Sequence, residues 1–158
     1  MRKELRFQGK EIQIEYSQKA DEMAHQLNAP MVMEMQIYFS CMLGKNLAYY
    51  SGSPIAGAYQ LAPSLFEELL EDSQQLTGNI YLRFNIVMTK DCPVAGCIGP
   101  PPVTDFAIVG SEAYVPSWLK IDFCDGIFTG EYGWKSSPTG QQNTKQVRGK
   151  ELQKSTYL

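Results

Sequence analysis

Strict alternation of apolar and polar residues marks the stretch between Asn79 and Thr89. Every second residue in it is large and apolar, and this apolar set is Ile80, Leu82, Phe84, Ile86 and Met88. A period of two places these side chains on one face of a β-strand, whereas a helix would spread them around its circumference. The pattern therefore predicts a central strand with one face on a core.

Other segments show shorter stretches of the same alternation. The segments predicted as strands are residues 4–16, a hairpin that turns at Gln8-Gly9-Lys10, and residues 31–43, 47–50, 106–109, 118–124 and 127–132. Gly9 suits the hairpin turn because glycine accepts the positive φ that two-residue hairpin loops require. Strands thus dominate the predicted secondary structure.

Two helices are predicted between the strands. The first covers 17–27, with Ser17 as the N-cap residue whose hydroxyl accepts a hydrogen bond from a first-turn amide. The second begins at Ser64, because Ser64 and Glu67 have the spacing of a capping box, and it ends at Thr77-Gly78.

The strands are not separated one by one by helices, which favours an α+β fold over a parallel α/β fold. We expect a mostly antiparallel sheet with two helices packed on one face, covering the side that carries Ile14, Ile37 and Phe84. Residues 1–134 are expected to form a single domain. Residues 135–158 are polar, lack apolar periodicity, and are predicted to be a flexible basic tail.

Composition and charge narrow the classes of function. The chain has 158 residues, 44% hydrophobic and 20% charged, which is typical of a globular protein. Residues 1–134 carry nine basic against sixteen acidic residues, a net charge of −7, and residues 135–158 carry five against one, a net charge of +4. The negative charge of residues 1–134 repels phosphate backbones, so nucleic-acid binding by this folded part is not expected. The tail is expected to aid solubility, or else to contact nucleic acid or an acidic partner.

No apolar run reaches the roughly 20 residues of a membrane-spanning helix. The first residues also lack the apolar run of a secretory signal, so a cytoplasmic protein without membrane attachment is expected.

The loop Cys92-Pro93-Val94-Ala95-Gly96-Cys97 holds the only compact group of chemically unusual residues. Two cysteines with four residues between them are at the loose end of zinc-ligand spacing, and a complete site needs four ligands. The remaining ligands of a zinc or iron site would come from Cys124 with Asp91 or Asp125. The loop is also compatible with a thiol-redox pair, with a disulfide, or with two ordinary thiols at the end of a strand.

Recognisable catalytic machinery is not evident in the sequence. His25 is the single histidine, and the helical pattern places it on the wet side of its helix, away from the apolar stripe. No nucleophile, metalloprotease or phosphate-loop motif accompanies it. We expect a protein that is not an enzyme.

Aromatic residues at the polar positions of strands are the remaining candidates. The predicted ligand-binding or interface residues are Tyr38, Tyr81, Arg83, Trp118 and Lys120. If their strands are neighbours, they form one aromatic sheet face, and Tyr, Trp and Arg are enriched at interfaces. This face would be a second small core layer, a homodimer interface or a pocket for a small apolar ligand. The hypothesis is a binding protein for another protein or a small ligand, and the alternative is a metal or thiol-redox protein that uses the cysteine loop.

Overall fold

The computed structural model describes residues 1–39, 43–89, 103–105 and 111–135. In chain order the elements are β1 (Arg2–Phe7), β2 (Lys10–Tyr16), α1 (Gln18–Gln26), β3 (Met31–Phe39), β4 (Leu43–Ser51), β5 (Tyr59–Gln60), α2 (Pro63–Glu71), β6 (Gln74–Thr77), β7 (Ile80–Thr89), β8 (Val103–Asp105), a 3₁₀ turn (Ser111–Tyr114), β9 (Trp118–Cys124) and β10 (Ile127–Gly133).

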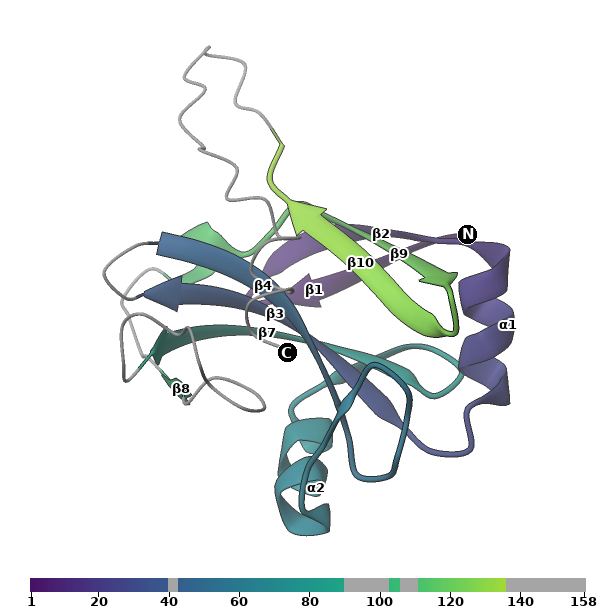
Figure 1. Ribbon diagram of the computed structural model, residues 1–158. Coiled ribbons are helices and arrows are strands. Elements are labelled where there is room, and N and C mark those ends of the chain that lie inside the picture. Colours follow the sequence, from purple (N-terminus) through teal and green to yellow (C-terminus); the bar gives the residue numbers. More distant parts are fainter. Residues whose placement is uncertain (40–42, 90–102, 106–110, 136–158) are drawn as a thin grey trace.

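These strands form two sheets that lie face to face (Figure 1). The four-stranded sheet has the order β1-β2-β9-β10, and the six-stranded sheet has the order β5-β4-β3-β7-β6 with β8 paired to β7. Both sheets are mixed, because β2 and β9 run parallel, as do β3 and β7, while the hairpin neighbours are antiparallel. The α+β class predicted from the sequence is confirmed.

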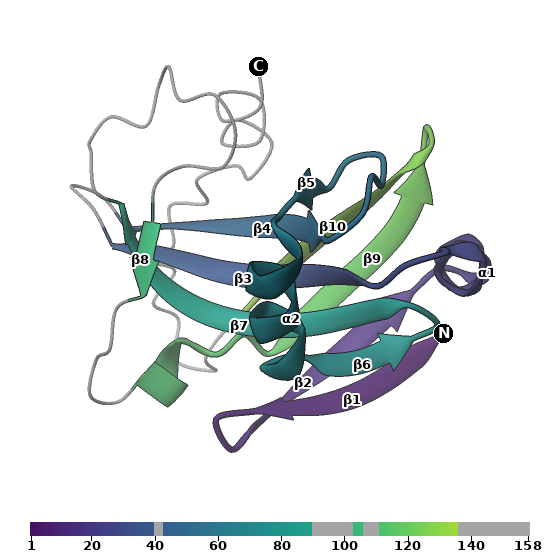
Figure 2. The same cartoon turned by 90° about the horizontal axis from the view of Figure 1, so that it is seen from below.

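The arrangement of the helices differs from the prediction of two helices on one face of a sheet. The faces with Ile14, Ile37 and Phe84 pack against each other between the two sheets, so the sheets cover one another. Helix α1 closes one end of this core, where it buries Ala20 and Ala24. Helix α2 lies on the opposite, outer face of the six-stranded sheet (Figure 2). The prediction failed because alternation shows which residues share a face and not what covers that face.

The first hairpin and α1 form as the sequence predicts. Gln8 and Gly9 both have positive φ, at 50° and 79°, as a two-residue turn with the twist of the flanking strands requires. The Ser17 hydroxyl oxygen accepts from the Ala20 amide at 3.1 Å and donates to Asp122 Oδ1 at 2.6 Å. Ser17 therefore caps α1 and ties it to β9.

The turn between β6 and β7 holds the other end of α1. Gly78 has a φ of +49°, and a Cβ atom there would lie 2.5 Å from the Ala24 backbone. The Asn79 amide donates to the Ala24 carbonyl at 2.9 Å, and its side chain donates to the Leu27 carbonyl at 2.7 Å. Helix and turn approach this closely because the turn residue has no side chain.

The start of α2 was predicted wrongly. The N-cap residue is Ala62, no side chain caps the helix, and Pro63 is its first residue. Proline fits this position because its φ is already helical and its missing N–H would have no partner there. The helix also ends earlier, at Glu71, and the short strand β6 follows where the prediction extended the helix to Thr77.

Several predictions fall wholly or partly outside the described residues. They include the strand over 106–109, residues 40–42 of the strand over 31–43, the cysteine loop over 92–97 and, apart from Lys135, the tail over 135–158. Within the described ranges, neither helix is long and apolar enough to span a membrane.

Candidate functional site

The outer face of the six-stranded sheet changes in polarity along its strands. We use "outer face" for the side turned away from the four-stranded sheet. Its central rows, read across β4, β3 and β7, are Tyr50–Val32–Tyr81, Ala48–Glu34–Arg83, Asn46–Gln36–Asn85 and Gly44–Tyr38–Val87. Successive rows are about 6.8 Å apart, because each is two residues further along the strands. The first row is thus carried by aromatic and aliphatic side chains, whereas the second, third and fourth rows each contain at least one residue of a hydrogen-bonded polar group.

Helix α2 covers the apolar end. Val32, Ala48, Tyr50 and Phe66 form a buried cluster separate from the main core, which we call the α2 cluster. Phe66 is the one buried residue of α2, and its ring lies against Gly52, where a Cβ atom would come within 3.1 Å. Half-buried residues around the cluster include Leu69 of α2 and Tyr81 of β7. The helix is therefore attached through a small apolar contact.

The polar end holds a buried group of hydrogen-bonded side chains. We call Glu34, Gln36, Tyr38, Asn46 and Arg83 the polar cluster. Gln36 is at its centre: its amide donates to Glu34 Oε1 at 2.7 Å, and its carbonyl oxygen accepts from the Tyr38 hydroxyl at 2.7 Å. Asn46 donates to the Tyr38 hydroxyl at 3.2 Å. A buried polar network whose members satisfy one another holds each side chain in a single orientation.

The charges of the polar cluster are balanced by Arg83. Its Nη1 donates to Glu34, whose side chain is only 4% exposed, and its Nε donates to Asp72 Oδ2 at 2.9 Å. Burial alone would lower the pKa of Arg83, but the Glu34 and Asp72 carboxylates outweigh it and raise the pKa above its usual value. Arg83 is therefore a permanent cation at the boundary between the apolar and polar ends.

Tyr132 supports the polar cluster from the other sheet. Its hydroxyl donates to the backbone carbonyl of Gln36 and lies 3.1 Å from that of Asn46, on the strands that carry the cluster. Burial raises the pKa of the Tyr132 phenol well above its usual value, so it remains a hydrogen-bond donor. The Lys45 ammonium donates to the Tyr132 carbonyl at 2.5 Å and lies 5.2 Å from the centre of its ring.

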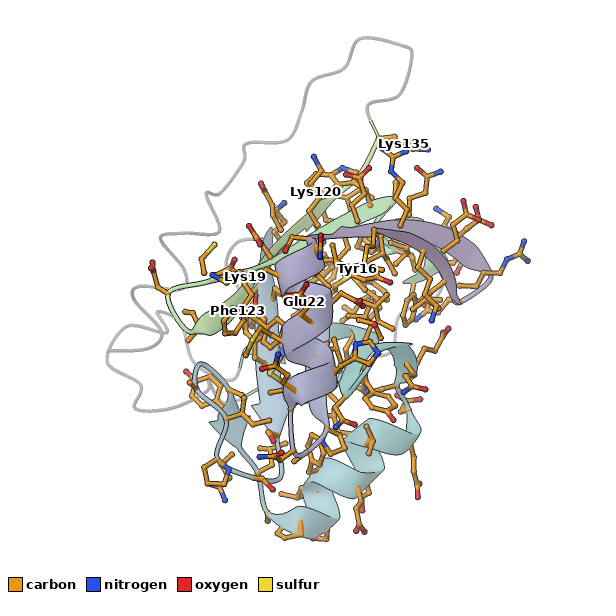
Figure 3. All side chains as sticks on the ribbon, turned by 90° about the vertical axis from the view of Figure 1, so that its right-hand side faces the viewer. Tyr16, Lys19, Glu22, Lys120, Phe123 and Lys135 are labelled. Atoms are coloured by element: carbon orange, nitrogen blue, oxygen red, sulfur yellow. The ribbon has the colours of Figure 1, made fainter. Side chains whose placement is uncertain are left out.

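The structure divides the predicted aromatic face between two sheets. Tyr38, Tyr81 and Arg83 share the outer face of the six-stranded sheet. Trp118 and Lys120 lie on β9 in the four-stranded sheet, where Trp118 packs on Gly133 and lies under the Lys120 ammonium. Figure 3 shows Lys120 on the upper layer and α2 at the opposite side of the molecule. The five residues therefore do not form one surface.

The metal alternative lies largely outside the described residues, because Asp91, Cys92 and Cys97 belong to the range 90–102. Cys124 is exposed, and its thiol lies 3.6 Å from Asp122 Oδ2. Partial loss of hydration and the Asp122 charge raise the pKa of this thiol. Asp125 occupies a positive-φ position in the β9–β10 turn. Within the described ranges, no group of three or more His, Cys, Asp or Glu residues could hold a metal ion.

Sequence reasoning missed the burial of the polar cluster and the role of Asp72. Alternation assigned Glu34, Gln36 and Tyr38 to a polar face, and a polar face is normally read as solvent-exposed. One signal was present: Met31-Val32-Met33 and Leu47-Ala48-Tyr49-Tyr50 are apolar at both parities. Strands that are apolar on both faces are covered on both sides, so polar residues within them are candidates for buried sites.

Comparison with known proteins adds neither a family nor a function, because no family model, curated protein or solved structure matches the chain.

Proposed function

We propose that the protein is a non-catalytic binding protein that takes a small ligand on the outer face of its six-stranded sheet. The observation that carries this proposal is the change from the apolar α2 cluster to the polar cluster within a single sheet face. Ligand sites are mostly apolar surfaces with a few polar groups in fixed positions. The five residues predicted from the sequence contribute three, Tyr38, Tyr81 and Arg83, to this face.

The cost of the polar cluster supports a role beyond stability. Burying an ion pair and its hydrogen-bonding neighbours is often no more stabilising than packing apolar side chains in the same place. The adjacent row, Tyr50–Val32–Tyr81, packs in the apolar α2 cluster on the same strands, and the Gln36 amide of the polar cluster donates to the Tyr50 hydroxyl at 3.1 Å. A sheet face that needed only stability could continue the apolar pattern, whereas prearranged polar groups reduce the entropy lost when a ligand binds.

The bonding of Glu34 supports binding over proton transfer. The carboxylate accepts from both Gln36 and Arg83, so its charge is compensated on two sides. A general base needs a carboxylate that is available to a proton of the substrate. Glu34 is arranged instead to hold Arg83 in place.

A thermal-shift screen tests this proposal with two matched variants. Tyr81→Ala and Trp118→Ala each remove a half-buried aromatic side chain from the outer side of a sheet, but from different sheets. A chemically diverse library of small molecules is screened against the unmodified protein. A ligand at ten times its Kd adds about 1.4 kcal/mol and raises Tm by roughly 3–6 °C.

The proposal requires that stabilisation by the hits is lost in Tyr81→Ala and kept in Trp118→Ala. Hits that stabilise both variants equally, or that lose their effect only in Trp118→Ala, would place binding elsewhere and contradict it.

A further inference from the structure

Arg83 is shared between two carboxylates in very different surroundings. The Glu34 side chain is 4% exposed and that of Asp72 is 72% exposed, while Arg83 itself is 15% exposed. One contact is thus within the protein, and the other is at its surface.

The surface contact is weakly held. Asp72 follows the last turn of α2 as its C-cap residue, and that turn contains no basic residue. A carboxylate at the C-terminal end of a helix faces the negative end of the helix dipole, which is unfavourable. Exposed ion pairs also contribute little to stability. Another carboxylate of matching geometry can therefore replace Asp72 on the guanidinium at low cost.

A carboxylate that replaced Asp72 on Arg83 would lie next to an apolar surface. Arg83 is one row away from the Tyr50–Val32–Tyr81 row, and α2 covers the apolar cluster there with one buried residue, Phe66, and with the half-buried Leu69 and Leu70. A short helix with so small a buried contact opens more readily than the strands beneath it. A cationic group beside an apolar surface that is covered by a short helix suits a ligand with a charged head and an apolar chain.

We infer that the ligand is an amphipathic carboxylate of the fatty-acid type. Its head group takes the place of Asp72 on Arg83, and its chain lies between α2 and the sheet. Glu34 keeps the guanidinium in position during this exchange. The number of carboxylates bound to Arg83 does not change, because the ligand carboxylate replaces that of Asp72. This inference rests on the proposed function and names the ligand class for the same site.

Titration calorimetry with decanoate below its micelle concentration tests the inference. Asp72→Asn removes the competing carboxylate, so it should tighten decanoate binding about two- to fivefold, the range expected for an exposed ion pair. Glu68→Gln is the matched control, because it removes one exposed charge from the same helix without touching Arg83. It should leave the affinity within about twofold.

Two further measurements separate head-group recognition from general apolar binding. Decan-1-ol has the same chain without the charge, and it should bind more weakly than decanoate and be insensitive to Asp72→Asn. Arg83→Lys keeps the positive charge but loses the planar fork that suits a carboxylate, so it should weaken decanoate binding. If circular dichroism shows that Arg83→Lys does not fold, the Asp72→Asn and decanol comparisons decide the question.

The inference is overturned if decanoate fails to bind both the unmodified protein and Asp72→Asn. It is also overturned if Asp72→Asn and Glu68→Gln have equal effects, or if decanol binds as tightly as decanoate. If decanoate fails while another class of ligand stabilises the protein in a Tyr81-dependent manner, the ligand class is wrong and the proposed site stands.

Discussion

Arg83 shows at the scale of one residue how buried charge constrains this protein. Replacing it by Met would leave the Glu34 carboxylate buried without its cation, which costs about 3–5 kcal/mol. The double variant Glu34→Gln/Arg83→Met removes both charges and should recover much of this loss. Urea denaturation of the single and double variants measures the difference.

Asp72→Asn is the control for the Arg83 experiment. Its ion pair is exposed, so the change should cost at most about 1 kcal/mol. A loss of less than 1 kcal/mol in Arg83→Met would mean that Glu34 is hydrated, against the buried environment described for it.

Tyr132 makes a second prediction at this scale. Tyr132→Phe removes the hydroxyl that reaches the Gln36 and Asn46 carbonyls, and it should cost about 1–2 kcal/mol of unfolding free energy. Tyr16→Phe, a half-buried tyrosine of β2, is the matched control and should cost less.

The contribution of Tyr132 to the free energy of unfolding should also change at alkaline pH. Its pKa is raised in the folded protein, so above the unfolded value of about 10 the unfolded chain loses the proton first. The Tyr132 contribution is therefore fully present below pH 10 and decreases as pH rises above it. Denaturation curves measured between pH 8 and about 11 give the free energy of unfolding at each pH. This free energy should fall less steeply with pH in Tyr132→Phe than in the unmodified protein. Equal pH dependence in the two proteins would contradict a raised pKa for Tyr132.

At the scale of elements, the two helix starts provide a direct comparison. Ser17→Ala removes a cap whose oxygen accepts from the Ala20 amide, and it should cost about 1 kcal/mol. Ser64→Ala should cost only a few tenths of a kcal/mol, because Ser64 lies inside α2, after Pro63. Thermal denaturation of both variants measures this; a larger loss for Ser64→Ala would restore the capping box predicted from the sequence.

The contact between Ser17 and Asp122 should also make stability depend on acidic pH. The hydrogen bond from the Ser17 hydroxyl, and then the one from the Phe123 amide, lower the pKa of Asp122. A lowered pKa means that the contribution of this contact is present above the unfolded value of about 3.9 and is lost as pH falls below it. Ser17→Ala should reduce that acid dependence.

The strands were largely predictable from sequence, and the helix boundaries less so. Alternation located β7 and β9, because a buried face enforces a period of two. It also located the start of β3, but the strand predicted over 31–43 was too long, since β3 ends at Phe39 and β4, predicted over 47–50, already begins at Leu43. β6 was missed, because Gln74, Gln75 and Thr77 give no apolar alternation. The start of α2 was misplaced because Pro63 and the Ser64 capping pattern are two competing signals for a helix start. The fixed φ of Pro63 sets the first turn, and the Ser64 pattern only resembles a cap.

At the scale of the whole molecule, the division into two sheets was not predictable from the sequence patterns used. Parity within β9 correctly places Trp118 and Leu119 on opposite faces, but it contains no information about which strands are neighbours. Pairing depends on contacts between residues far apart in the chain, such as Gln13 with Trp118. Of the predicted site residues, Tyr38, Tyr81 and Arg83 therefore belong to the candidate site. Trp118 and Lys120 do not, because they lie on the other sheet. Glu34 and Asp72 belong to the site through contacts that no local pattern encodes.

The proposed function places the ligand on the outer face of the six-stranded sheet. Mapping of backbone amide chemical shifts by NMR, during titration with the ligands found in the screen, tests it most directly. We expect the largest shifts on β3, β4, β7 and α2, with Arg83 and its neighbours among them. Shifts confined to the outer face of β1, β2, β9 and β10 would contradict it.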